Sequence, residues 1–215
     1  MLIKGYVRGD VAGNLFFAAH VMLAAAVTFA GMLQLVPQIR AKAPWFHRWN
    51  GRMFLSAAGA ASLAGFYMIW VRGTYLNIPS ALASSLNVVL VIAFGILAWR
   101  AVLAGEIAEH RRWAMRTFLV ANGVWFMRVG VFGWVLLNRG PVGMGDHMDG
   151  PVDYFLDFAC YLLPLAVLEL YLRAKGNPAP IARSAMAGGL FTATAFMWVG
   201  IFGFGMFSLK ILAKL

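Results

Sequence analysis

Charged residues are scarce in this chain of 215 residues: Lys, Arg, Asp and Glu make up 12% of it, and only 8 residues are acidic. Hydrophobic residues make up 62%, and the mean hydropathy is +0.76. Soluble globular domains carry about 25% charged residues, so this composition excludes that class. It is the composition of an integral membrane protein.

Cysteine is nearly absent as well. The single Cys160 excludes an internal disulfide and a cysteine-based metal cluster. The sequence also lacks the GxxxxGK[ST] phosphate loop, the HExxH metalloprotease motif and the GxSxG nucleophile elbow. Hydrolytic and nucleotide-driven functions are therefore disfavoured. The net charge of +10 indicates membrane topology rather than nucleic-acid binding.

Six apolar runs are each long enough to cross a bilayer, which takes about 20 residues. They lie at 11–36, 53–71, 79–101, 115–138, 151–173 and 185–209. Their connections are short and leave no room for a soluble domain. The sequence therefore predicts an all-α fold, a single transmembrane domain over 1–215 with six helices in three hairpins.

Basic residues alternate between the two sides of this predicted bundle. One side holds Arg40, Lys42, Arg48, Arg52, Arg100, Arg111, Arg112, Arg116, Arg173, Lys175 and Arg183, and the other holds Lys4, Arg8, Arg72, Arg139, Lys210 and Lys214. Cytoplasmic loops of membrane proteins carry the excess of Lys and Arg. We therefore expect 37–52, 101–114 and 174–184 in the cytoplasm of a bacterium, both termini outside it, and a location in the inner membrane.

One phrase occurs twice. "HRWNGRMFL" at 47–55 returns as "HRRWAMRTFL" at 110–119, 63 to 64 residues later. Each copy lies where a predicted helix enters from the cytoplasmic side, so the first two hairpins are predicted to be an internal repeat. The third hairpin departs from the pattern, because its loop "RAKGNPAPIARS" has no histidine.

The stretches "GMLQLVPQIRAKAPWFHRWNGRMFL" (31–55), "HRRWAMRTFLVANGVWFMR" (110–128) and "LELYLRAK" (168–175) resemble a bacterial membrane-protein family, the domain of unknown function 2306. The resemblance implies a multi-span membrane protein and no particular activity. It marks His20, Gln34, Arg40, His47, Arg48, Gly51, Arg52, His110, Trp113, Met115, Arg116, Arg128 and Glu169.

The two repeated histidines suggest a cofactor site. Two neutral imidazoles suit haem iron, and neighbouring arginines suit its propionates. The candidate haem b residues are His20, His47, His110, Arg48, Arg52, Arg111 and Arg116. Two other interpretations stay open: the arginines and tryptophans anchor helices at the membrane interface, or the arginines hold an anionic phospholipid or quinol headgroup.

A second group of polar residues lies deep in the apolar runs. His20, Asn87, Arg128 and Asp157 fall at one level in the outer half of the predicted bundle. Ionisable groups at such depth usually face the bundle interior and one another. We expect a structural pair of Arg128 with Asp157, a proton relay or transport site, or a haem on His20.

Two further features are noted. The outer loop "RGPVGMGDHMDGPVDYFLD" brings Met144, His147 and Met148 together as a candidate copper site, although its Gly and Pro favour a flexible loop. Gly200, Gly203 and Gly205 in the last run are suited to a close approach of another backbone, within the bundle or in a partner subunit.

Three functions remain open. The leading hypothesis is a b-type cytochrome that passes electrons, with quinone as a candidate partner. The alternatives are a transporter or proton-relay protein built on the deep polar group, and a noncatalytic subunit of a larger membrane complex. Enzymatic activity is undecided, and no feature indicates nucleic acid as a partner.

Overall fold

The computed structural model describes residues 7–177 and 179–212, and this part of the chain is all-α. The helices are α1 (Val11–Leu35), α2 (Pro37–Lys42), α3 (Pro44–Trp70), α4 (Ile78–Leu103), α5 (Ile107–Ala121), α6 (Gly123–Leu137), α7 (Pro151–Gly176) and α8 (Pro180–Leu212). They form two compact units, unit 1 over residues 1–121 and unit 2 over residues 122–215.

Five of these helices, α1, α3, α4, α7 and α8, are individually long and apolar enough to cross a membrane. Helices α5 and α6 have 15 residues each and are too short singly, but as one span they make a sixth. The predicted all-α membrane protein is therefore confirmed, with five or six spans. The predicted orientation of the termini stays a prediction, because helix length and composition do not show which side of the membrane an end faces.

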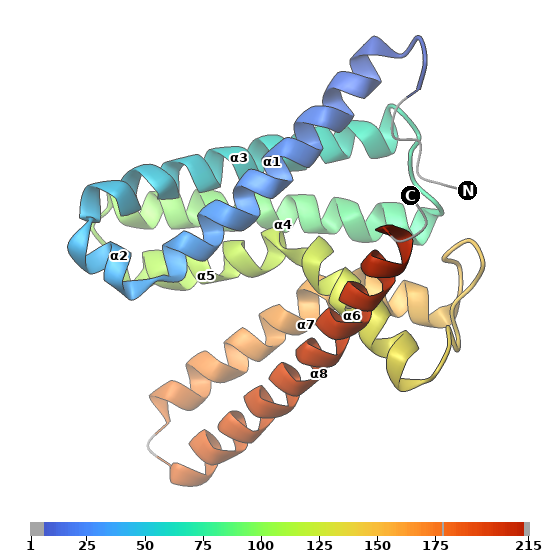
Figure 1. Cartoon of the computed structure of the whole chain (residues 1–215). Coiled ribbons are helices and arrows are strands. Elements are labelled where there is room, and N and C mark those ends of the chain that lie inside the picture. Colours follow the sequence, from blue (N-terminus) through green and yellow to red (C-terminus); the bar gives the residue numbers. More distant parts are fainter. Residues whose placement is uncertain (1–6, 178, 213–215) are drawn as a thin grey trace. The chain divides into compact units, whose positions relative to one another are not determined.

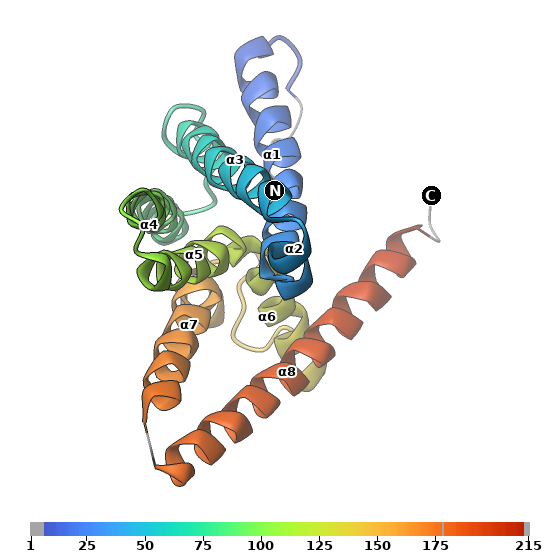
Figure 2. The ribbon, with the colours of Figure 1, turned by 90° about the vertical axis from the view of Figure 1, so that its left-hand side faces the viewer.

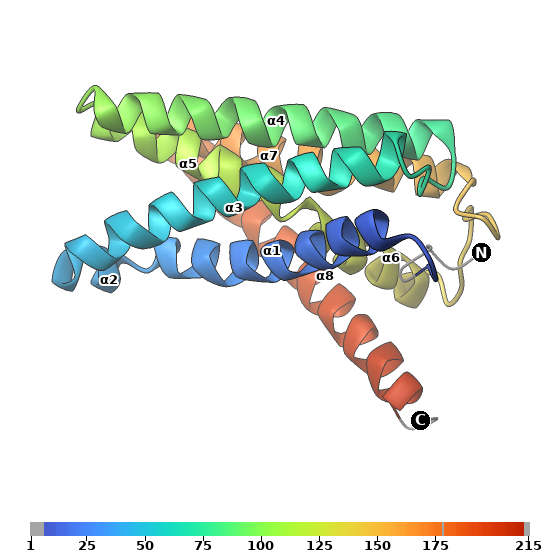
Figure 3. The same cartoon turned by 90° about the horizontal axis from the view of Figure 1, so that it is seen from above.

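In unit 1, α3 packs against α1 and α4, and α5 packs against α4 (Figures 1 and 3). In Figure 2, α1, α3, α4 and α5 follow one another round an arc. Small side chains fill the contacts, among them Ala57, Ala58, Ala61 and Ala64 of α3, and Ala81, Ala83 and Ala98 of α4. Small residues allow close backbone approach, which drives helix association in lipid.

In unit 2, α6 packs against α8 and α7. Gly200 of α8 lies against the backbone of Val129, and Gly203 lies against Phe132. The close approach expected at these two glycines therefore occurs within unit 2. Gly205 has no such neighbour among the described residues, because its missing side chain would point into open space.

Two predicted boundaries were wrong. The second helix begins at Pro44 rather than residue 53, and the predicted loop before it contains α2. Prolines at the first position of α2 and α3 start both helices, since that position needs no backbone N–H. The run predicted at 115–138 is not one helix, because it is interrupted at Asn122. Hydropathy alone detects neither the early start of α3 nor the interruption at Asn122.

Candidate functional site

The repeated histidines lie at one end of unit 1, which we call the histidine end. His47 is in the first turn of α3 and His110 is in the first turn of α5, and both are half-buried. The two histidines are 63 positions apart in the sequence, but they lie in the first turns of two helices that start at the same end of unit 1 (Figure 1). Both lie within helices rather than in the predicted loops.

The ring nitrogens of these histidines have different environments. Nδ1 of His110 lies 2.9 Å from the backbone oxygen of Ala98 on α4. A proton on Nδ1 is donated to that oxygen, and Nε2 then keeps a lone pair for a ligand. Nδ1 of His47 is buried and has no hydrogen-bond partner within the described part of the chain. Buried polar atoms without partners are rare in folded proteins.

The arginines of the two phrases make matching contacts. The guanidinium of Arg52 lies 5.0 Å from the centre of the Trp49 ring. The guanidinium of Arg116 lies 4.5 Å from the centre of the Trp113 ring. Both distances are within the range of a cation–π interaction. The other three arginines of the phrases, Arg48, Arg111 and Arg112, are exposed, and Arg112 pairs with Glu109 at 2.8 Å.

The phenylalanines of the two phrases meet at one glycine of α1. A Cβ added to Gly31 would lie 2.8 Å from the ring of Phe118 and 3.0 Å from the ring of Phe54. Gly31 therefore leaves the space that both rings occupy. It has its own counterpart 64 residues later in Gly95 of α4, near Leu55 and Thr117.

Polar side chains in the helices of unit 1 bond to backbone oxygens of neighbouring helices. Nδ1 of His20 lies 2.8 Å from the oxygen of Ala61, Asn50 Nδ2 donates to the oxygen of Ala30 at 2.8 Å, and Gln34 Nε2 donates to the oxygen of His47 at 2.9 Å. Such bonds hold helices together inside a membrane. His20 and Gln34 thus have structural roles, and Nε2 of His20 keeps the capacity to bind a ligand.

Glycine exposes two of these backbone oxygens. Gly65 follows Ala61 by one helical turn, and a Cβ there would lie 3.2 Å from the His20 ring. Gly51 follows His47 by one turn and faces the amide of Gln34. A side chain one turn after a carbonyl lies over it, because side chains tilt toward the helix N-terminus. The missing Cβ opens the path to each oxygen.

Asn87 stabilises the end of α5. A helix end leaves its last four carbonyls without intrahelical partners, and lipid offers none. Asn87 Nδ2 of α4 donates to the oxygen of Val120 at 2.9 Å, next to the interruption at Asn122. Asn87 therefore joins α4 to the end of α5, at the depth along the helices where the sequence predicted a polar site.

Arg128 and Asp157 belong to unit 2, so the four residues of the predicted deep site divide between the two units. Among the described residues, no ion pair joins Arg128 to Asp157. Arg128 is exposed on α6, whose packed face is formed by Val129, Gly130 and Gly133. Depth along a helix is the same for every face, so it does not determine which neighbour a side chain meets.

Asp153 organises the loop before α7. Asp153 is 3% exposed, and its Oδ2 accepts the backbone N–H groups of Gly145 and Gly150 at 2.8 and 3.0 Å. His147 is exposed, and the loop turns at Met148 with φ of 56°. No group of three or more His, Cys, Asp or Glu gathers as a metal site in the described residues.

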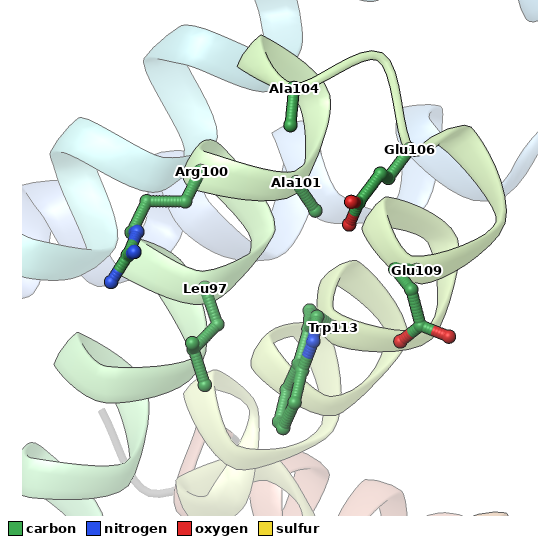
Figure 4. Close-up of a pocket in the computed structure, with 7 residues that line it drawn as sticks. All are labelled: Leu97, Arg100, Ala101, Ala104, Glu106, Glu109 and Trp113. Atoms are coloured by element: carbon green, nitrogen blue, oxygen red, sulfur yellow. The ribbon is translucent and has the colours of Figure 1, made fainter.

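Two hollows lie on unit 1. One, of about 410 Å³, is at the histidine end and is lined by Leu97, Arg100, Ala101, Ala104, Glu106, Glu109 and Trp113 (Figure 4). The other, of about 290 Å³, lies mainly between α3 and α4. Neither is lined by His47 or His110. Any ligand of the histidine pair would thus need space beyond these hollows.

The family model for a predicted membrane protein (DUF2306) matches residues 17–142, more than half of the chain. The chain belongs to the DUF2306 family. It is therefore a multi-pass membrane protein, as its five long apolar helices indicate. Searches of curated proteins and of solved structures each found no match to it.

Most of the residues that the resemblance marked lie inside the matched region. From His20 to Arg128 they fall inside the DUF2306 match, whereas Glu169 lies beyond it. Four of them take part in the contacts between helices described above: His20, Gln34, Gly51 and His110. Trp113 and Arg116 contact each other within α5.

Sequence reasoning missed an ion pair at the opposite end of unit 1. Arg72 Nε donates to Asp10 Oδ2 at 2.8 Å, and the Arg72 side chain is 8% exposed. Asp10 also caps α1, accepting the N–H of Gly13. That N–H, and next the hydrogen bond and charge of Arg72, lower the pKa of Asp10 against the opposing effect of burial. The sequence signal for this role of Asp10 was an acidic residue directly before an apolar helix, because acidic side chains often cap helix N-termini.

Proposed function

We propose that this DUF2306 protein is a small membrane electron-transfer protein that binds one haem b at the histidine end of unit 1. The observation that carries the proposal is that His47 and His110, from two like phrases 63 residues apart, lie in the first turns of α3 and α5 at the same end of unit 1. Imidazoles are common axial ligands of haem iron. The bonding of His110 Nδ1 to a backbone oxygen also supports it, because ligating histidines usually donate their other N–H in this way.

The buried Nδ1 of His47 is the second supporting observation. A polar atom without a protein partner fits a site that a further group completes. His47 and His110 would hold the iron, and Arg48 and Arg111 would bind the propionates. These two arginines are exposed next to the histidines, whereas Arg52 and Arg116 lie over tryptophan rings.

A bound haem b would supply a one-electron carrier. The residues of this chain would position and tune it: the Ala98 oxygen would orient the His110 ring, and charge from Arg40 near His47 would favour the reduced state. Quinone dissolved in the bilayer is the proposed electron partner, since a membrane-embedded carrier meets it by lateral diffusion.

The proposal includes a duplicated scaffold. Hairpin α1–α3 and the hairpin that begins with α4 and α5 would be two copies, which the matching Arg-over-Trp contacts and the shared contact of Phe54 and Phe118 with Gly31 support. The histidine end would face the cytoplasm, and the membrane would be the bacterial inner membrane, because the basic loops gather on that side.

The visible absorption spectrum of purified protein from haem-replete cells tests the haem. A Soret band is expected, and His47→Ala and His110→Ala should each abolish it while the protein remains folded by circular dichroism. His147→Ala is the matched control and should leave the band unchanged. Loss of the band in His20→Ala alone would instead place the haem at the opposite end. A colourless wild-type protein would refute the haem.

The transporter hypothesis receives less support from the described residues. His20 and Asn87 are each engaged with a backbone oxygen of a neighbouring helix. These contacts account for two polar groups of the deep site without any transported species. The third hypothesis, a noncatalytic subunit, predicts a colourless protein and no effect of the histidine substitutions on absorption.

A further inference from the structure

An apolar groove lies on unit 1 between α3 and α4, two helices long and apolar enough to cross a membrane. Its lining residues are Leu55, Ser56, Ala58, Gly59, Val91, Ile92, Gly95, Ile96, Trp99 and Thr117. They belong to the halves of α3 and α4 nearer the histidine end, except Thr117 of α5, which is fully buried. At about 1.5 Å per residue the groove extends along about 12 Å of α4, from Val91 to Trp99.

Glycine makes the groove. A Cβ at Gly59 would meet nothing within 4 Å, and a Cβ at Gly95 would meet only Leu55 and Thr117 at 3.7 and 4.0 Å. The groove has a volume of about 290 Å³ and a mainly apolar lining. It thus has the polarity of an acyl chain.

Two basic side chains lie on the same helix faces as the groove, toward the histidine end. Arg52 precedes Ser56 by four residues on α3, and Arg100 follows Ile96 by four on α4, and residues four apart share a helix face. Both arginines are exposed, and neither forms an ion pair with any described residue. Arg100 points away from Glu106 and Glu109 in Figure 4.

The groove lies between two helices that each carry an arginine four residues from a lining residue, an arrangement that matches one kind of occupant in a membrane. We propose that α3 and α4 bind an anionic phospholipid, one acyl chain lying in the groove and the headgroup phosphate bound by Arg52 and Arg100. A zwitterionic lipid offers the same chain but also brings a cation to the arginines. This site is independent of the proposed haem, which uses other side chains.

Native mass spectrometry of the full-length protein in detergent tests the proposal, with dioleoyl phosphatidylglycerol and dioleoyl phosphatidylcholine as the probes. Wild-type protein should retain phosphatidylglycerol selectively. Arg52→Gln and Arg100→Gln should each weaken its retention about fivefold, as expected for one basic residue at an anionic headgroup. Arg173→Gln, an exposed arginine of unit 2, is the control and should leave retention unchanged.

A substitution that fills the groove tests the binding of the acyl chain separately from the binding of the headgroup charge. Gly59→Leu has space for its side chain and should abolish selective retention while the protein keeps its helicity. Gly188→Leu, also facing open space, is the matched control. Unchanged retention in Gly59→Leu, or equal losses in Arg52→Gln and Arg173→Gln, would overturn the proposal. So would a wild-type dimer that Gly59→Leu converts to a monomer, since a second copy would then fill the groove.

Discussion

Replacing Gly200 by alanine should push α6 and α8 apart. A Cβ at Gly200 would lie 2.7 Å from Val129 Cγ1 and 2.9 Å from the Val129 carbonyl carbon. Carbon atoms pack at about 3.5 to 4.0 Å, so the helices would have to separate by about 1 Å. Because part of the obstacle is backbone, a rotamer change in Val129 cannot remove it.

The magnitude follows from two opposing effects. Overpacking in a well-packed contact costs about 1–3 kcal/mol. Alanine also gains up to about 1 kcal/mol over glycine in helix propensity. Gly205→Ala receives the same gain without the collision, because a Cβ at Gly205 meets nothing within 4 Å. The difference between the two variants therefore isolates the overpacking cost of about 1–3 kcal/mol.

Thermal unfolding in detergent, followed by circular dichroism, measures this difference. Gly200→Ala should unfold below Gly205→Ala, by about 2–4 °C for each kcal/mol in a chain of this size. Gly205→Ala should unfold at or slightly above the wild-type temperature. If the two variants shift the midpoint equally, α8 does not approach α6 at Gly200, and the packing described for unit 2 is refuted.

Three other outcomes are expected. Because the pKa of Asp10 is lowered in the folded protein, its charge stabilises the fold at pH values above the unfolded pKa of about 3.9, and this stabilisation is lost as pH falls through the lower folded pKa. The stability deficit of Asp10→Asn should therefore be present at pH 7 and shrink in acid. A deficit that does not change with pH would argue against the pair with Arg72. Stability losses of Arg128→Ala and Asp157→Ala should add to within about 0.5 kcal/mol in the double variant, whereas a milder double variant would indicate contact. External thiol labelling should reach cysteine introduced at Gly145 but not at Lys42; the reverse would invert the proposed topology.

Much of the fold was predictable from local composition. Apolar runs placed α1, α4 and α7 to within three residues at each end, because burial in lipid requires about 20 apolar residues wherever the helix packs. The start of α3 was missed, since His47 and Arg48 are polar and hydropathy takes polar residues for a loop. Proline at position 44 was the signal for that start.

The candidate site was predictable in its residues but not in its contacts. The repeated phrases identified His47 and His110, and the structure brings both to one end of unit 1. Asp153, Asn50 and Gln34 were not predicted to bond to backbone groups, because nothing in the sequence shows which backbone groups lack partners. Arg128 and Asp157 shared a predicted depth but form no described pair.

The sequence by itself determined the class of protein, the approximate spans, the charge asymmetry and the duplicated phrases, all of which are properties of consecutive residues. Tertiary structure decided that Phe54 and Phe118 share the space at Gly31, that Gly200 meets Val129 while Gly205 meets nothing, and that the chain turns at Asn122. The physical reason is that lipid replaces water around every span. Helix contacts then depend on side-chain shape and on hydrogen bonds to particular carbonyls, which only the packed arrangement of helices specifies.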